Sequence, residues 1–441
     1  MSTKKSTALP KPKPKRTIKR KIGIAFLTLF GLIVGLGVAS HIFPTFGAAL
    51  ADHVRAVVGP GPVAWLEDVT YGIEDRIKRV IYRNSPPKQF WDEPPAAPAV
   101  AAAPAVAAPP SLLAVPPSLL TVPPPLLAVA LPPTQGPDAP SAEAPVFPPQ
   151  SFKPPVPSVA GKADGQWIAI ADTEDPSAPP LFYKAIVHPD KARSFAAVAV
   201  VAIDLSRVGL TLVPGTVEPA SPLLPREQRT GLIPQDQFAD LVAAFNGGFK
   251  AEHGHFGMMI DGVALLPPRN ISCTIGIYKD GSLKIRTYPA LKDEEDDMRA
   301  YRQTPPCLVE DGKINNRLLS AENSVGWGTA VGGDTVIRRS AVGLDADGKT
   351  LFYGLGVSVT ADSLARAMLA ADAENAAQLD VNSIYPRFLF YTHPADELPK
   401  VESALIPDVE FVKHEYVDRS EVRDFFFLTR KHATSSLHAH R

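Results

Sequence analysis

Cysteine is scarce in this chain of 441 residues, which contains only Cys273 and Cys307. The pair forms no CxxC motif and has no zinc-ligand spacing with histidine, which excludes a disulfide-dense scaffold and a zinc ribbon. One disulfide and a pair of buried free thiols are both compatible with the pattern. An excess of positive charge is also lacking, because 45 Lys and Arg face 46 Asp and Glu. The net charge of −1 gives no sign of nucleic-acid binding, so we expect no nucleic-acid partner.

Long apolar runs are scarce as well, and the one that is long enough to cross a bilayer lies at residues 22–43. As a helix, its 22 residues span about 33 Å, the thickness of the hydrocarbon core. Residues 1–21 carry nine Lys and Arg and no acid, so this basic tail is predicted to stay cytoplasmic. The run predicts a single-pass transmembrane helix in a bacterial inner membrane, with the C-terminal domain in the periplasm or outside. A signal peptide cleaved near residues 49–51 is the alternative.

Residues 63–83 carry apolar side chains at helical spacing and predict an amphipathic helix. Such a helix is compatible with three positions: on the membrane surface, against a second copy of the chain, or docked on the distal domain. Gly31 and Gly35 form a small-xxx-small pattern inside the apolar run, which leaves a homo-oligomer open.

Proline is abundant, with 47 residues, and 23 of them lie between residues 86 and 157. The repeats PPSLLAV, PPSLLTV and PPPLLAV follow one another at residues 109–129. A proline pair in every repeat is incompatible with a continuous helix and favours extended polyproline II. We therefore predict that residues 86–157 form a disordered, semi-rigid stalk.

Residues 160–430 have the pattern of a folded domain, and residues 431–441 have that of a disordered tail. Short apolar alternations predict strands, and Asp-Gly turns predict hairpins at residues 273–288 and 340–355. Helical spacing begins after a capping Thr360, and a strand-like segment follows it. The predicted fold class is α+β: a strand-rich mixed-sheet domain with a late strand–helix–strand unit.

Glycine and polar residues are concentrated at residues 245–262, FNGGFKAEHGHFGMMIDG. A strand that ends in Asn246-Gly247-Gly248 permits positive φ and lets another group approach the backbone closely. An ordinary tight turn is the alternative reading of the same three residues.

Four further segments with recognisable motifs follow residues 246–248 along the chain. They are Gly257 with Asp261-Gly262, the Arg-Ser-Ala-Val-Gly segment at 339–343 with its Asp-Gly hairpin, the helix at 363–371, and Leu379-Asp380. In this order the chain resembles the phosphodiester glycosidase family over roughly residues 165–430. The resemblance implies a domain that removes a sugar from a phosphodiester.

Cleavage of a sugar from a phosphodiester requires an acid or base near the anomeric carbon and a group that holds the phosphate. Asp380, at the C-terminal end of a strand, is the candidate catalytic carboxylate. Arg339 is the candidate phosphate ligand, since its planar fork can bind two oxygens. Asn246 is the third catalytic candidate, and the N–H groups of Gly247 and Gly248 are candidate substrate contacts.

His255 and Asn382 complete the candidate substrate-binding set. His255 lies two residues after His253 and near Glu252, but no third metal ligand has supporting spacing. We therefore expect no cofactor, while a divalent metal stays open.

The family closes with Leu-Asp-Gly-Gly-Gly, whereas this chain reads Leu-Asp-Val-Asn-Ser at residues 379–383. Val381 and Asn382 are expected to narrow any approach to the backbone. The sequence supports a membrane-anchored extracytoplasmic hydrolase that cleaves a sugar–phosphodiester or a related anionic envelope glycan. The alternative is a catalytically degenerate glycan-binding or structural cell-envelope protein.

Overall fold

The computed structural model describes residues 59–91, 147–319, 326–328, 335–382 and 384–432. The predicted basic tail, the span at 22–43, most of the stalk and residues 433–441 lie outside these ranges. Within them, no helix combines the length and apolar character needed to cross a membrane.

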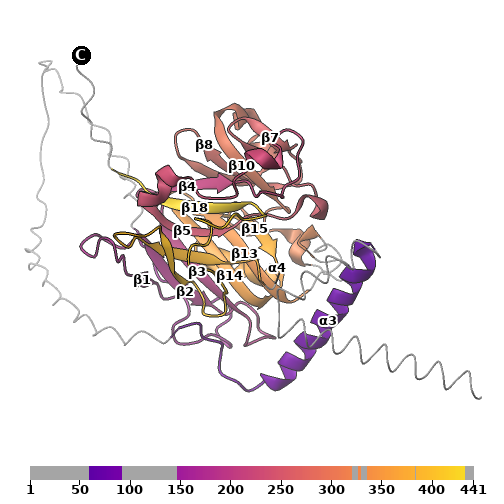
Figure 1. The fold of residues 1–441 in the computed structure, drawn as a ribbon. Coiled ribbons are helices and arrows are strands. Elements are labelled where there is room, and N and C mark those ends of the chain that lie inside the picture. The colour runs from indigo at the N-terminus through magenta and orange to yellow at the C-terminus, as the bar shows by residue number, and fades with distance from the viewer. Residues whose placement is uncertain (1–58, 92–146, 320–325, 329–334, 383, 433–441) are drawn as a thin grey trace, which may run out of the picture.

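Three sheets, here called A, B and C, form the folded body (Figure 1). Sheet A has the spatial order β1 (Ile168–Ile170), β2 (Phe182–Val187), β3 (Ala197–Asp204), β14 (Thr350–Val359), β13 (Ile337–Leu344), β15 (Asn375–Val381), β11 (Val309–Glu310) and β12 (Lys313–Ile314). Sheet B has the order β17 (Lys400–Ala404), β16 (Phe388–Thr392), β5 (Leu241–Asn246), β18 (Phe425–Arg430) and β4 (Val208–Val213). Sheet C has the order β7 (Val263–Leu266), β6 (Met258–Ile260), β10 (Met298–Thr304), β8 (Cys273–Tyr278) and β9 (Leu283–Thr287).

Helices are few among the described residues. The α-helices are α3 (Pro60–Ile81) and α4 (Ala361–Ala370). Short 3₁₀ helices are η1 (Arg226–Gln228), η2 (Gln235–Asp240), η3 (Ala251–His253), η4 (Tyr288–Ala290), η5 (Lys292–Asp297) and η6 (Asn316–Leu319). This content fits the predicted α+β class.

The late strand–helix–strand unit consists of β14, α4 and β15. Thr360 caps α4, because its side chain accepts a hydrogen bond from the backbone N–H of Ser363 at 3.0 Å. β14 and β15 each pair antiparallel with β13, so they run parallel to one another on either side of it. The Asp-Gly turns join β8 to β9 and β13 to β14 as hairpins, with positive φ at Gly281 and Gly348.

Strand β3 is buried along its whole length because both faces of sheet A are covered. Ala199 and Val201 point into the larger core, which sheet A shares with sheet B. Val198 and Val200 point into a second core, closed by α4. The alternation of side chains along one strand thus serves both cores.

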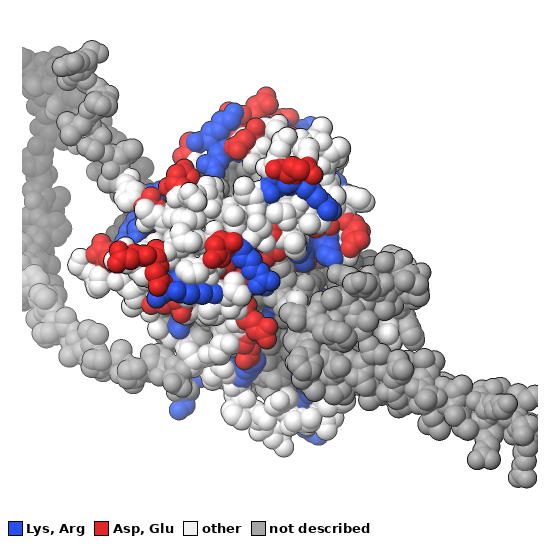
Figure 2. Space-filling model, viewed as in Figure 1, with Lys and Arg blue, Asp and Glu red and all other residues white. Residues whose placement is uncertain are grey.

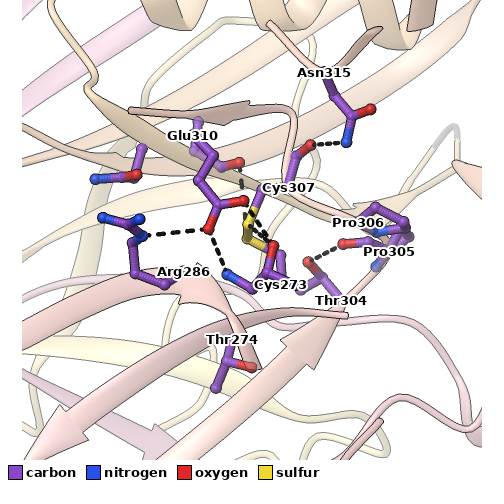
Figure 3. Close-up of a disulfide and its surroundings, with 12 residues drawn as sticks. Cys273, Thr274, Arg286, Thr304, Pro305, Pro306, Cys307, Glu310 and Asn315 are labelled. Atoms are coloured by element: carbon purple, nitrogen blue, oxygen red, sulfur yellow. Dashed lines mark hydrogen bonds and ion pairs between the residues drawn. A yellow bond between two sulfur atoms is a disulfide. The ribbon is translucent and has the colours of Figure 1, made fainter. Parts of the chain in front are cut away.

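Sheet C lies at the end of the body that carries the β7, β8 and β10 labels in Figure 1, and its strands β8, β9 and β10 contact β15 of sheet A. A disulfide joins Cys273, the first residue of β8, to Cys307, two residues before β11. Beside it, Glu310 accepts hydrogen bonds from Arg286 Nε at 3.2 Å and from the backbone N–H of Thr287 at 2.8 Å (Figure 3). Of the two alternatives for the cysteines, the structure therefore contains the disulfide.

The packed body extends further than the predicted boundary at residue 160, and parts of the predicted stalk belong to it. Trp167 donates from Nε1 to the Gln150 carbonyl at 3.2 Å, and the Phe152 ring packs against Trp167. Phe90 is buried in the larger core. Residues 86–91 and 147–157 therefore pack on the domain, because each segment carries aromatic residues that the Pro/Ala-rich repeats lack.

Candidate functional site

The Asn246-Gly247-Gly248 segment lies where the three sheets meet. Strand β5 of sheet B ends at Asn246, and the Gly247 carbonyl accepts a hydrogen bond at 3.1 Å from the backbone N–H of Asp380 in sheet A. A Cβ at Gly247 would lie 2.1 Å from Asp424 Oδ2, and one at Gly248 would lie 2.7 Å from Arg302 Cζ of sheet C. The two glycines are thus required for close approach, as the sequence predicts.

Asn246 holds this junction and is fully buried. Its Nδ2 donates to Ser340 Oγ at 2.9 Å, and its Oδ1 accepts from Tyr353 Oη at 2.7 Å and from the backbone N–H of Arg387 at 3.1 Å. Ser340 in turn donates to the Asp380 carbonyl at 3.0 Å. Asn246 therefore positions the strand that carries Asp380, and its amide is already occupied by protein groups.

The N–H groups of Gly247 and Gly248 are also occupied. Gly247 donates to the Asp424 carbonyl at 3.0 Å, and Gly248 donates to Asp424 Oδ2 at 2.8 Å. Arg302 meets the same carboxylate with two hydrogen bonds, from Nε at 2.9 Å and from Nη2 at 3.1 Å. Both side chains are almost completely buried, so this pair fixes the junction and offers no open N–H to a substrate.

Asp380 forms an ion pair with Arg423, the residue before Asp424. Side-chain exposure is 3% for Asp380 and 10% for Arg423, so the guanidinium is the more accessible partner. Burial raises the pKa of Asp380 to about 6, although the Arg423 charge opposes the shift. Burial would lower the pKa of Arg423, but Asp380 and its other anionic neighbours raise it overall.

Arg423 is only partly used by the protein. Its Nη2 donates to the Gly248 carbonyl at 3.3 Å, and its guanidinium lies 4.1 Å from the centre of the Tyr385 ring. Within the described part of the chain, the buried Nε has no hydrogen-bond partner. A buried N–H of a guanidinium that lacks an acceptor is suited to bind an anionic oxygen.

Asn382 supports this arrangement from the other side. Its Oδ1 accepts from the backbone N–H groups of Ile384 at 2.9 Å and of Tyr385 at 2.5 Å, which forms an Asx turn. The hydroxyl of Tyr385 donates to the Asp424 carbonyl. Asn382, a departure from the family's glycine, therefore places the ring on which Arg423 lies.

Val381, the other departure from the family's glycines, packs closely against neighbouring residues. A Cβ at Gly328 would lie 2.7 Å from Val381 Cγ2 and 3.2 Å from the Phe249 ring. The backbone at Gly328 thus packs directly against the Val381 side chain.

The Arg339 side chain does not point to the same side of sheet A as the groups around Asn246. Arg339 and Ser340 are neighbours in β13 and point to opposite faces of sheet A, and it is Ser340 that faces Asn246. The fully buried Arg339 guanidinium donates to the carbonyls of Trp327, Thr335 at 2.9 Å and Val359 at 3.2 Å. These contacts place the Arg339 guanidinium on the α4 face of sheet A, where it orders the chain around Trp327.

His255 lies on the exposed turn after η3, with a φ of 48° and its backbone N–H donated to the Ala251 carbonyl at 2.8 Å. The neighbouring His253 is 42% exposed at its side chain. Across the residues that the structure describes, no three or more His, Cys, Asp or Glu are grouped to hold a metal ion.

The sequence motifs point to Asp380 and the glycine junction but not to their neighbours Arg423, Asp424, Arg302 and Tyr385. The signal for two of them is the charged dipeptide that directly precedes the buried aromatic strand β18. Its proximity to Gly247 follows only from the pairing of Phe425 with Asn246, which the sequence does not reveal.

The fold and the site together define the protein as an α+β domain that holds a carboxylate–guanidinium pair at a junction between sheets. The family model for phosphodiester glycosidases matches residues 239–380, a range that begins just before β5 and ends at Asp380. The resemblance predicted from the sequence is therefore confirmed over this range.

The solved structures that match the chain include the catalytic domain of zebrafish N-acetylglucosamine-1-phosphodiester alpha-N-acetylglucosaminidase, auto-inhibited by its pro-peptide. It has 16% sequence identity and a TM-score of 0.36, with coverage of 60% of this chain and 87% of that one. A hypothetical protein from Synechocystis has 12% identity and a TM-score of 0.29, with coverage of 58% and 65%. No curated protein sequence matches the chain.

Proposed function

We propose that this protein hydrolyses a sugar–phosphodiester or a related anionic glycan, with Asp380 as the catalytic carboxylate and Arg423 as the phosphate ligand. The observation that carries the proposal is the buried Nε of Arg423, which has no acceptor among the described residues and belongs to the guanidinium that pairs with Asp380. The family match over residues 239–380 supports the substrate class.

In the proposed reaction, a phosphate oxygen binds Arg423 and the sugar's anomeric carbon faces Asp380. With a pKa of about 6, Asp380 is mostly ionised at pH 7 and can accept a proton from the attacking water. The water forms a bond to the anomeric carbon while the bond from that carbon to the phosphate oxygen breaks. The products are a reducing sugar and a phosphate monoester.

A single carboxylate suffices in this scheme because of the leaving group. Glycosidases usually pair a base with an acid that protonates a departing alcohol. A phosphate monoester has a second pKa of about 6, so it leaves near neutral pH without a proton from the protein. Arg423 supplies the charge that stabilises the departing oxygens.

The location of the reaction is also a proposal. The basic residues 1–21 and the apolar run 22–43 favour a single-pass anchor in a bacterial inner membrane, with the domain in the periplasm or outside and glycan substrates in the envelope. Protease added to intact spheroplasts should then remove the domain and leave residues 1–21 protected. Digestion of residues 1–21 with the domain spared would reverse the orientation.

A second function, glycan binding without catalysis, is favoured by the low exposure of Asp380 and by the cover over Val381. The two functions separate in one assay of the full chain in detergent against a panel of N-acetylglucosamine-1-phosphodiesters. Release of reducing sugar and phosphate monoester supports hydrolysis. Saturable binding without release, measured by calorimetry, supports the binding function. If neither release nor binding is detected, both functions are contradicted.

A further inference from the structure

Helix α3 docks on the domain through its polar side. Arg193 meets Asp75 with two hydrogen bonds, from Nε at 2.7 Å and from Nη2 at 2.9 Å, and Asp75 is buried. Thr335 Oγ1 donates to Asp68 Oδ1 at 2.7 Å, and Lys78 Nζ lies 3.4 Å from Ser358 Oγ. These contacts fix the rotation of the helix about its axis.

From Leu66 to Ile81, the opposite side of α3 is apolar and uncovered. This apolar strip consists of Leu66, Val69, Ile73, Ile77, Val80 and Ile81. The exposed fraction of its members runs from 38% at Val69 to 77% at Val80. At about 100° per residue, Asp75 lies about 180° from the middle of the strip, so the domain cannot bury it.

The shape of the strip argues against a coiled-coil partner. It covers about 120° of the helix circumference, whereas a two-stranded seam uses only the narrower a/d positions. Broad apolar faces of this kind suit a helix that lies in the membrane–water interface, with basic residues along the border. Arg76, the residue of α3 next to the Val69 edge of the strip, is exposed.

The position in the chain points to the same partner. The apolar run ends at Phe43 and α3 begins at Pro60, so the 16 residues between them reach at most about 55 Å. A domain tethered by that run has α3 as its nearest described element. We infer that the apolar strip inserts into the surface of an anionic lipid bilayer and thereby sets the orientation of the domain.

The inference is tested with the full chain in nanodiscs that contain anionic phosphatidylglycerol and one protein copy each. A spin label is placed at Ile77→Cys, or at Val80→Cys as a second position, since the native cysteines are joined in a disulfide. The control label is at Ala346→Cys, exposed in the turn before β14, at the opposite end of that strand from Ser358. Relaxation by oxygen, which dissolves in lipid, is compared with relaxation by a water-soluble nickel chelate.

If the strip lies in lipid, its spin label is relaxed by oxygen, and its relaxation by the nickel chelate is several-fold weaker than that of the Ala346 label. Equal nickel access at both labels would overturn the inference. Shielding that appears only with two copies per disc would assign the strip to a second chain instead. Shielding from both reagents would assign it to protein cover, and failure of the chain to associate with discs also counts against the proposal.

Discussion

Arg423 and Asp380 form an ion pair although they lie beside different sheets, Asp380 in β15 of sheet A and Arg423 just before β18 of sheet B. Both residues contact the glycine junction, since Asp380 donates its backbone N–H to the Gly247 carbonyl and Arg423 donates from Nη2 to the Gly248 carbonyl. A buried carboxylate usually requires a paired charge, and here the paired guanidinium also has a donor to spare. The same contact therefore serves stability in the free protein and, in our proposal, phosphate recognition.

Replacement of Arg423 by Lys should reduce kcat/KM by roughly 10²–10³ on a sugar-1-phosphodiester, because Lys keeps the charge but loses the planar donors. The matched control is Arg430→Lys at the far end of β18, where Arg430 pairs with Asp172 at 2.6 Å. The control should retain activity within a small factor. Equal losses in the two variants would indicate a general effect of losing a guanidinium instead of a phosphate ligand.

The activity should depend on pH through Asp380. Its pKa is raised from the ordinary value of 3.8 to about 6, so the base form increases with pH and kcat/KM should rise to half its plateau near pH 6. Asp380→Asn should lower the plateau by roughly 10²–10⁴ and remove this rise. Steady-state rates between pH 4.5 and 8 check both. A variant as fast as the wild type would assign the base to another group.

Arg339→Lys should act on stability. Lys cannot reach the carbonyls of Trp327, Thr335 and Val359 together, and buried acceptors without donors cost roughly 2–4 kcal/mol. Urea unfolding measures the loss, and KM of the folded fraction should stay unchanged. The neighbouring Arg338→Lys, at a half-buried position, should cost less than about 1 kcal/mol. An increase in KM for Arg339→Lys with unchanged stability would restore its expected phosphate role.

The sequence predicted the local features well, since hairpin turns, the Thr360 cap and the Asn-Gly-Gly junction depend on a few neighbouring residues. The sequence-based prediction failed where the position of a side chain depends on pairing between strands that are distant in the chain. Arg339 looked accessible because a motif does not show which face of a strand a side chain takes, and here Ser340 faces Asn246 while Arg339 faces Trp327. Arg423 lies 43 residues after Asp380 in the chain, so only the sheet junction brings the two together.

Gly247→Ala should disrupt the junction, because the added Cβ would lie 2.1 Å from Asp424 Oδ2 and 2.3 Å from the Asp424 carbonyl oxygen. Overpacking against this buried backbone should cost about 3 kcal/mol, visible as a lower urea midpoint. Gly72→Ala is the matched control, since nothing lies within 4 Å of its Cβ and it lies inside α3. That change should leave stability unchanged or raise it by up to about 1 kcal/mol. Tolerance of both substitutions would contradict the close packing at Gly247.

The disulfide between Cys273 and Cys307 should contribute measurably to stability, because it closes a loop over a sequence separation of 34 and fastens sheet C to sheet A (Figure 3). In the chain-entropy model such a loop stabilises by about 3–4 kcal/mol. The Cys273→Ser, Cys307→Ser variant should therefore unfold at lower urea than the wild type. Dithiothreitol should lower the wild type to the level of the variant and leave the variant unchanged.

The charge distribution should keep the protein from binding nucleic acid. On the face seen in Figure 2, acidic and basic side chains are intermixed and no broad field of one sign is visible. Nucleic-acid affinity depends on a basic surface that displaces counterions, and the net charge of −1 supplies no excess. Fluorescence anisotropy with labelled single- and double-stranded DNA at 150 mM salt, using a variant in which the nine Lys and Arg of residues 1–21 are replaced by Ser, should show no saturable binding up to micromolar protein. Saturable binding whose affinity falls steeply with salt would reveal a basic surface on a face that Figure 2 does not show.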